Sequence, residues 1–312
     1  MSQENKEYKD FETHILDFDS ILNDAVKEPE LYTELLNSSR GLIKLLLKEM
    51  PIIKREAEQE YIDLLKRSII RMRQIFKEKV LVVCGYMIGV LYHLQAYRDV
   101  ISIVQSYFPQ KVNYSEFTKI EDAGVLGYYY GLTKIKIGDY TDAANALDKA
   151  YIVCKEEKRN ELLMYLVPLK LRIGQYPSKL MMNKYGTPFL RELCDYVSRG
   201  DVAKYEQLIL KNGLELFRIG MYEVIQSLRL IVYRNLLEKI VMIKKQYKFN
   251  IDILVVVINS MIEDDHEKVD SASVMNVLMN MICSGILVGN LVISFNAVTM
   301  APQNALKYYS DN

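Results

Sequence analysis

Apolar residues recur about every 3.6 positions from Phe11 to about Ile282, which predicts a chain built mostly of amphipathic α-helices. Only 7 prolines and 14 glycines interrupt this pattern, so we expect long helices. The predicted helices cover Phe11–Ala25, Ser38–Glu49, Pro51–Ile75, Val80–Leu94, Tyr97–Tyr107, Asn160–Arg172, Lys179–Lys184, Pro188–Val197, Asp201–Lys211, Glu223–Tyr247, Ile251–Met261 and Ser271–Ser284.

The segment Glu121–Cys154, EDAGVLGYYYGLTKIKIGDYTDAANALDKAYIVC, is typical of a tetratricopeptide-like (TPR-like) helix–turn–helix repeat. We expect Gly131 to let two helices approach closely, and Gly138 with Asp139 to form the turn. The residues that define the pattern are Gly131, Gly138, Tyr140, Ala143, Leu147 and Ala150. Since this is the single clear copy, we expect neighbouring helix pairs to be degenerate repeats that stack and leave a concave surface for partners.

After about Tyr247 the pattern changes to two short helices followed by β-rich runs. Two of these runs, Ile286–Val288 and Leu291–Phe295, are joined by Gly289-Asn290, a pair typical of a hairpin turn, and a third run lies near Val298–Met300. Helix–helix–helix–hairpin is the order of a winged helix. The sequence therefore predicts a mostly α fold, with TPR-like helical repeats stacked into a solenoid and followed by a C-terminal winged helix with a small β-hairpin.

These patterns divide the chain into four expected segments. They are an N-terminal helical region (1–115), TPR-like repeats (116–222), the winged helix (223–302) and a polar tail (303–312). We expect the tail to fray, because it has few apolar residues to hold it against a core.

Composition argues against charge-driven binding to nucleic acid or membrane, against C-x-x-C sites, and against a secreted or membrane-spanning protein. Lys and Arg total 40, as do Asp and Glu, so no global charge steers the protein to nucleic acid or membrane, and any basic surface is local. The four cysteines, Cys84, Cys154, Cys194 and Cys283, lie in apolar contexts outside any C-x-x-C pair and are expected to be buried reduced thiols. The polar N-terminus is unlike a secretory signal, and we interpret the apolar runs Val80–Leu94 and Leu278–Phe295 as core rather than membrane spans.

Catalytic motifs are missing from the sequence. The three histidines, His14, His93 and His266, are far apart and lack metal-spaced neighbours, and no phosphate loop or nucleophile elbow occurs. His266 alone lies among carboxylates, in the run 263–267. We therefore expect a protein that is not an enzyme and that holds no cofactor or metal.

A cluster of cations marks the second half of the long predicted helix 223–247. At about 100° per residue, Arg234, Lys244, Lys245 and Lys248 fall within one arc of about 100°. Phosphate contact by the distal lysines and a solvated helix end that complements the helix dipole both fit this pattern. The candidate nucleic-acid-binding residues are Arg234, Lys239, Lys244, Lys245 and Lys248.

A second basic cluster lies in the repeat region and is better explained as a solvated helix face, with docking of an acidic chain or RNA as the alternative. It consists of Lys66, Arg67, Arg71, Arg73, Lys77 and Lys79.

The winged-helix end favours protein pairing over base reading. Its candidate recognition helix, SASVMNVLMNMICS, and its hairpin, ILVGNLVISF, contain no Lys or Arg, so Asn276 and Asn280 alone could reach base edges. An uncharged hairpin can pair with a partner through its edge strand, although its residues can also serve the internal core. The candidate partner-binding residues are Leu287, Val288, Leu291, Ile293 and Phe295.

Three segments carry a family resemblance: ELLMYLVPLKLRIGQ at Glu161–Gln175, LRLIVYRNLLEKI at Leu228–Ile240, and the repeat GDYTDAANALDKAY. Together they resemble the PCI (proteasome–signalosome–initiation factor) proteins, above all those of the nuclear messenger-RNA export complex known as transcription and export complex 2 and the signalosome subunit-twelve-like proteins. The resemblance covers roughly Phe117–Pro302, and its most specific parts are Tyr165–Pro168 and Tyr233–Leu236.

The resemblance implies stacked helical repeats that end in a winged helix. It also implies three partners: a larger PCI scaffold subunit, a small acidic disordered subunit shared with the proteasome lid, and RNA or DNA bound weakly and without sequence preference. A nuclear location, with association with the nuclear pore, would follow. The alternative is a PCI subunit of a signalosome-like or proteasome-lid assembly without a nucleic-acid role.

Overall fold

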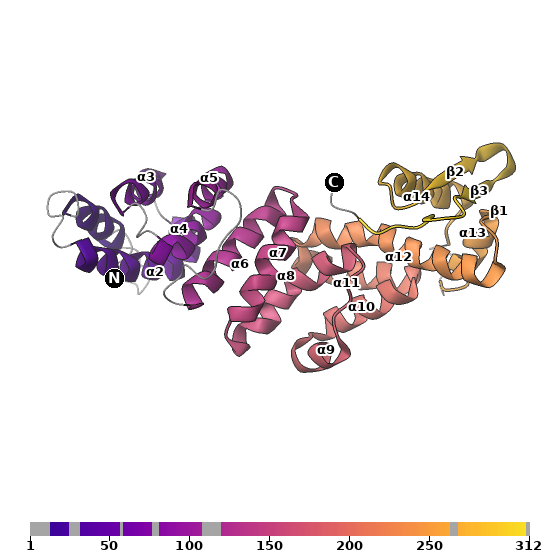
Figure 1. Ribbon diagram of the computed structural model, residues 1–312, viewed down its shortest axis with the longest axis horizontal. Coiled ribbons are helices and arrows are strands. Elements are labelled where there is room, and N and C mark those ends of the chain that lie inside the picture. The colour runs from indigo at the N-terminus through magenta and orange to yellow at the C-terminus, as the bar shows by residue number, and fades with distance from the viewer. Residues whose placement is uncertain are drawn as a thin grey trace. The chain divides into compact units, whose positions relative to one another are not determined.

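A computed structural model describes residues 13–24, 32–56, 59–76, 81–107, 120–262 and 268–309 (Figure 1). The chain divides into two compact units, Met1–Lys158 and Arg159–Asn312. This division falls inside the segment 116–222 that the sequence predicts as one run of repeats. Each unit is therefore described by itself.

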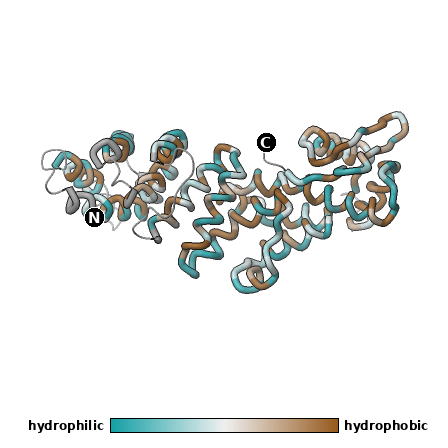
Figure 2. Tube along the Cα trace, in the orientation of Figure 1, coloured by the Kyte–Doolittle hydropathy of each residue, from teal (hydrophilic) through white to brown (hydrophobic). Residues whose placement is uncertain are grey.

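The first unit is helical throughout its described residues. Its helices are one over residues 13–24, α2 (Tyr32–Glu56), α3 (Gln59–Phe76), α4 (Leu81–His93), α5 (Tyr97–Tyr107), α6 (Ile120–Lys136) and α7 (Tyr140–Val153), with a 3₁₀ turn at Glu156–Lys158. Hydrophobic and hydrophilic residues alternate along most of these helices (Figure 2), whereas α4 is apolar almost throughout. The apolar faces of residues 13–24 and of α2 to α6 contribute to one buried cluster, in which Phe18, Leu46 and Met87 are fully buried. The fold of this unit is thus the product of amphipathic helices that turn their apolar stripes toward one another and toward α4, whose residues 83–91 are buried on every side.

The predicted break between helices 38–49 and 51–75 is wrong. A single helix, α2, runs through both Ser39 and Pro51. Proline removes one backbone hydrogen bond from a helix. In α2, Ile43, Leu46 and Met50 lie on one face and are buried, so tertiary packing holds the turns of the helix that lead into the proline.

The repeat-like segment folds as the sequence predicts. α6 and α7 form a hairpin whose turn contains Gly138 at φ +83°, and a Cβ at Gly131 would lie 2.6 Å from Cγ of Leu147. Ala143 and Ala150 are fully buried on the inner side of α7. The glycine in the turn and the small residues at the contact therefore have the roles that their spacing indicates.

An ion-pair cluster closes the α6–α7 turn. The ammonium of Lys134 lies 2.7 Å from Oδ2 of Asp139 and 2.9 Å from Oδ2 of Asp142. Burial lowers the pKa of Lys134, but the hydrogen bonds to Asp139 and Asp142 outweigh it and raise this pKa above its ordinary value. Asp139 also caps α7, because its carboxylate accepts a hydrogen bond from the backbone N–H of Asp142.

The second unit begins with five helices. They are α8 (Arg159–Arg172), α9 (Lys179–Tyr185), α10 (Pro188–Arg199), α11 (Val202–Arg218) and α12 (Tyr222–Lys244), of which α10, α11 and α12 pack against one another (Figure 1). Asp201, the first residue of the predicted helix, caps α11, and the helix runs on to Arg218 rather than ending at Lys211. Gly200 has φ +65°, and its Cα faces the backbone of Leu236 in α12, so α10 and α12 meet closely at this turn.

The unit ends in a winged helix, formed by β1 (Lys248–Asn250), α13 (Asp252–Asn259), α14 (Ser271–Cys283), β2 (Gly289–Val292) and β3 (Ala297–Met300). The three strands form one antiparallel sheet in the order β1-β3-β2. α12 packs against α14 and serves as the first helix of this module. The predicted fold class is confirmed: the chain is mostly α-helical, with helical repeats followed by a winged helix that carries a small sheet.

The predicted turn at Gly289-Asn290 is wrong, because both residues lie in β2. The strands reverse instead through Ile293–Phe295 and Asn296, whose φ is +46°. Asparagine tolerates this left-handed conformation. Gly289 is needed in the strand itself, since a Cβ there would collide with the carbonyl oxygen of Thr299 in β3.

The predicted fraying of the tail is wrong for residues 303–309. After a bend at 302–304, the chain pairs with the segment that precedes β2: the N–H of Val288 donates to the carbonyl of Ala305, and that of Lys307 to the carbonyl of Ile286, each at 2.8 Å. Residues 301–309 then lie against the helices of the same unit (Figure 1). We call residues 301–309 the C-terminal strap.

Candidate nucleic-acid and partner-binding surfaces

Three of the predicted phosphate-binding cations are exposed on one short segment. Lys244 ends α12, Lys245 follows it in a left-handed conformation at φ +53°, and Lys248 opens β1. Because the helix ends at Lys244, the single helical arc predicted for these lysines does not describe Lys245 and Lys248. The segment 244–248 nevertheless presents three cations within five residues at the carboxyl end of a helix, where positive charge complements the helix dipole.

Arg234 lies away from this segment and is buried. Its side chain is 8% exposed, pairs with Glu238 one turn along α12, and stacks on Tyr308 with Cζ 4.1 Å from the ring centroid. Lys239 donates a 2.7 Å hydrogen bond to the carbonyl of Arg199, the last residue of α10. Neither cation therefore contributes to the basic segment 244–248.

Arg234 and Asn235 of the Tyr233–Leu236 motif have a structural role, because their side chains bond to neighbouring elements. The amide nitrogen of Asn235 donates to the hydroxyl of Tyr176 at 3.0 Å and to the carbonyl of Val197 at 2.7 Å, while its oxygen accepts from Arg234 at 2.9 Å. Burial raises the pKa of Tyr176 to about 12, which keeps its hydroxyl protonated. The residues that carry the family resemblance thus fix α12 to its neighbours and hold the ring of Tyr308 in the strap.

The five candidate partner-binding residues fall into two groups. Leu287 is 1% exposed and belongs to the core, and Leu291 is half-buried opposite Val298, which is fully buried on the inner side of the sheet. Val288, Ile293 and Phe295 are exposed. Ile293 and Phe295 lie in the turn between β2 and β3, so this turn, the wing tip, presents two large apolar side chains to solvent.

The sheet offers further features that the sequence pattern did not show. Lys248, Thr299 and Asn290 are directly opposite one another across β1, β3 and β2, and therefore share the face turned away from the core residue Phe249. β2 is an edge strand, which suits addition of a strand from another chain. Met242 and Ile243, just before the basic segment, are also largely exposed.

The basic cluster on α3 is partly explained by internal contacts. Arg71 donates to the side-chain oxygen of Asn23 at 2.7 Å, and Arg67 to the carbonyl of Asp63 at 3.3 Å. Lys77 and Lys79 lie outside the described residues, as does the side chain of Arg73. Arg67 therefore stays exposed on α3, whereas the half-buried Arg71 is held against Asn23.

Within the described residues, no group of three or more His, Cys, Asp and Glu side chains is placed to hold a metal ion. Nδ1 of His14 lies 3.1 Å from a carboxylate oxygen of Glu49, and His93 packs edge-on against Tyr129. His266 lies outside the described residues.

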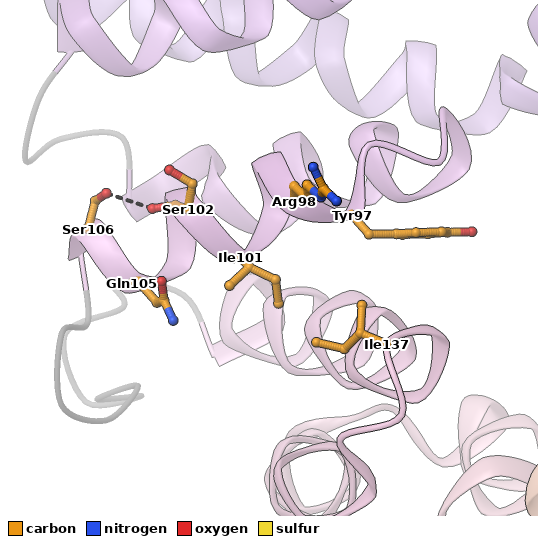
Figure 3. A pocket seen from close by; sticks show the side chains of 7 residues that line it. All are labelled: Tyr97, Arg98, Ile101, Ser102, Gln105, Ser106 and Ile137. Atoms are coloured by element: carbon orange, nitrogen blue, oxygen red, sulfur yellow. Dashed lines mark hydrogen bonds between the residues drawn. The ribbon is translucent and has the colours of Figure 1, made fainter.

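A hollow of about 440 Å³ lies beside α5 and is lined by Tyr97, Arg98, Ile101, Ser102, Gln105, Ser106 and Ile137 (Figure 3). Its lining offers no carboxylate, imidazole or thiol, and the hydroxyl of Ser106 donates to the carbonyl of Ser102.

The described part of the chain contains no helix that is both long and apolar enough to cross a membrane.

The cysteines differ in exposure, which corrects the expectation that all four are buried. Cys84 is fully buried, and burial raises the pKa of Cys194 to about 12, whereas Cys283 is exposed at the end of α14.

Since the thiolate is the reactive form, we expect maleimide to label Cys283 first under native conditions and to leave Cys84 and Cys194 unlabelled until urea is added. Mass spectrometry of tryptic peptides measures this, and Cys283→Ser should remove the fast phase. Fast labelling of Cys84 would contradict the packing of α4.

Comparison with known proteins gives several distant relatives, whereas no protein-family model matches the chain. The chain is 24% identical over 195 residues to PCI domain-containing protein 2 of Xenopus laevis, which covers 62% of this chain and 48% of that protein. It is 28% identical over 126 residues to the PCI domain-containing protein 2 homolog of Drosophila melanogaster, covering 39% and 32%. It is 24% identical over 143 residues to enhanced ethylene response protein 5 of Arabidopsis thaliana, covering 45% and 34%. The matched part thus spans about a third to a half of the length of these relatives.

Proposed function

We propose that this chain is a non-catalytic subunit of a nuclear messenger-RNA export complex. Its similarity to PCI domain-containing protein 2 supports a PCI-domain scaffold. In this proposal it pairs with a larger PCI scaffold subunit, binds a small acidic disordered subunit, and contributes to weak, non-specific binding of RNA or DNA in the nucleus, in association with the nuclear pore. The observation that carries the proposal is a winged helix, with strand order β1-β3-β2, at the end of a run of helices.

The wing is the part of the chain best suited to pairing with the larger scaffold. β2 leaves one edge of the sheet open, and Ile293 and Phe295 extend from the adjoining turn. Apolar side chains in this position are more useful to a protein partner than to nucleic acid, because phosphates and base edges require charged or polar groups.

Affinity purification of the full chain at low salt tests the assembly. Export-complex subunits in the eluate would support the proposal, and the double variant Ile293→Ser/Phe295→Ser should reduce recovery of the PCI partner. Recovery of proteasome-lid or signalosome subunits instead would favour the alternative, a PCI subunit of such an assembly without a nucleic-acid role. The absence of Lys and Arg from α14 fits this alternative.

The basic segment 244–248 is the proposed nucleic-acid contact. Reversing its charge with Lys244→Glu, Lys245→Glu and Lys248→Glu should weaken binding of a single-stranded RNA oligonucleotide to the complex at least tenfold, because each lysine releases counterions from phosphate. Fluorescence anisotropy over a salt series measures both the affinity and its dependence on salt, whose slope should become shallower.

A matched variant controls for the change in net charge. Lys136→Glu, Lys179→Glu and Arg191→Glu reverse three exposed cations elsewhere and should leave RNA affinity within about twofold. Equal binding by the wild type and the segment variant, with an unchanged salt slope, would refute the nucleic-acid contact while leaving the scaffold role intact.

A further inference from the structure

The helix α11 has an apolar stripe that the fold leaves uncovered. Leu210, Leu214 and Phe217 are 77%, 69% and 73% exposed. Their spacing of four and three residues places them on one face of the helix, one above another. The stripe is therefore a continuous strip of large apolar side chains in contact with water.

This stripe is distinct from the face of α11 that builds the core. Tyr205, Leu208, Ile209 and Leu216 point to the other side and are buried, where α11 packs against α10 and α12 (Figure 1). A surface helix of a globular protein needs one apolar face, and α11 has two. A continuous apolar patch that the fold leaves exposed is typical of a surface that binds another molecule.

Cations line one border of the stripe. By helical geometry, Lys204, Lys211 and Arg218 fall within about 40° of one another, and Arg218 lies about 40° from Leu214. Within the described residues, the ion pairs of Lys204 and Arg218 are long, at 4.0 Å to the N-cap residue Asp201 and 3.8 Å to Glu215. Because both cations are exposed and these pairs are long, the cations can bind another acid.

The opposite border is formed by an aromatic ring. A Cβ at Gly213 would lie 3.7 Å from the ring of Tyr222, so the ring covers the glycine beside the stripe. The hydroxyl of Tyr222 accepts a hydrogen bond from Nε2 of Gln226 at 3.1 Å. The surface therefore consists of an apolar strip with an aromatic wall on one side and a row of positive charge on the other.

We propose that this surface of α11 binds an amphipathic helix of a partner protein that has acidic residues beside its apolar face. Such a helix presents apolar side chains at the same three- and four-residue spacing, and its Asp or Glu residues face Lys204, Lys211 and Arg218. The site is separate from the wing and from the basic segment 244–248, so it adds a second interaction surface to the proposed scaffold.

A second copy of this chain fits the surface poorly. In a twofold antiparallel pair of α11 helices, the cationic border of one helix faces the cationic border of the other. Like charges in this position oppose association. An acidic helix places opposite charge at the same border, and we therefore commit to it as the occupant.

The test uses two synthetic helical peptides and the full chain. Both peptides carry leucines at helical spacing; one has flanking glutamates and the other flanking lysines. Fluorescence anisotropy should show the acidic peptide binding at least tenfold more tightly, with Leu210→Gln/Leu214→Gln reducing this binding at least tenfold. Lys211→Glu/Arg218→Glu should reverse the preference between the two peptides.

Control variants separate the stripe from general surface hydrophobicity. Ile152→Gln/Leu180→Gln removes two exposed apolar side chains from other helices and should leave binding unchanged. All the substituted side chains are exposed, so circular dichroism should show unaltered folding. Equal affinity for the two peptides, or acidic-peptide binding that survives Leu210→Gln/Leu214→Gln, would overturn the proposal. So would a dimer in sedimentation velocity that depends on Leu210 and Leu214, which would make the occupant a second copy.

Discussion

Replacing both Tyr308 and Tyr309 with alanine is expected to lower the free energy of unfolding of the second unit by about 2–4 kcal/mol. Each ring lies under an arginine, Tyr308 beneath Arg234 and Tyr309 beneath Arg172, with 4.1 Å from Cζ to the centroid in both pairs. A partly desolvated cation–π contact contributes about 1–2 kcal/mol, and the two rings also cover apolar surface. Loss of Tyr308 in addition leaves the guanidinium of Arg234 without its stacking partner inside the fold.

Urea unfolding followed by circular dichroism measures this change. The matched control is Tyr308→Phe/Tyr309→Phe, which keeps both rings and removes the 3.2 Å hydrogen bond from Tyr309 to the carbonyl of Ser227 and the longer one from Tyr308 to Asn235. It should lose less than about 2 kcal/mol, since a neutral hydrogen bond contributes about 1 kcal/mol. Hydrogen exchange should also quicken at residues 286–288 in the alanine variant. A double alanine variant as stable as the wild type would mean that the strap does not hold the winged helix to α8 and α12.

Gly131→Val is expected to destabilise the first unit by about 1–3 kcal/mol. A Cβ at this position would lie 2.6 Å from Cγ of Leu147 and 3.3 Å from the carbonyl oxygen of Ala143, so α6 and α7 must move apart. Overpacking a tightly packed contact has this magnitude. Leu147 is fully buried and cannot swing into solvent to relieve the contact.

The control for Gly131 is another helical glycine in the same unit. An added Cβ at Gly41, in α2, meets no atom within 4 Å. Gly41→Ala should therefore stabilise the unit by about 0.5–1 kcal/mol through its higher helix propensity. Thermal unfolding of both variants gives the comparison. Equal melting temperatures for Gly131→Val and the wild type would show that the two helices are not in close contact at Gly131.

The sequence predicted the α6–α7 hairpin closely because its signals are local. Gly138 has a positive φ, Asp139 caps the helix that follows, and the small residues of α7 meet Gly131. Each role depends on residues close to one another along the chain, so spacing reveals it. The order of the three helices and the hairpin of the winged helix was predictable for the same reason, whereas the short strand β1 between α12 and α13 was not predicted.

The exposed sites were less predictable. Arg234 has the same charge as Lys244 and lies on the same predicted helix, but it is buried under Tyr308, a residue 74 positions later in the chain. Sequence periodicity does not reveal the stripe Leu210–Phe217. The predicted helix ends at Lys211, before Leu214 and Phe217, and periodicity does not show whether another element covers a shared face.

By itself, then, the sequence determined the helical periodicity, the repeat hairpin, the order of the winged helix's three helices and hairpin, and the absence of a sequence motif for catalysis. Only the tertiary structure decided which cations and apolar side chains remain exposed, where the wing turns, and how the C-terminal strap is held. The reason is physical: helix formation and capping depend on neighbours within a turn or two, whereas burial depends on contacts between residues far apart in the chain.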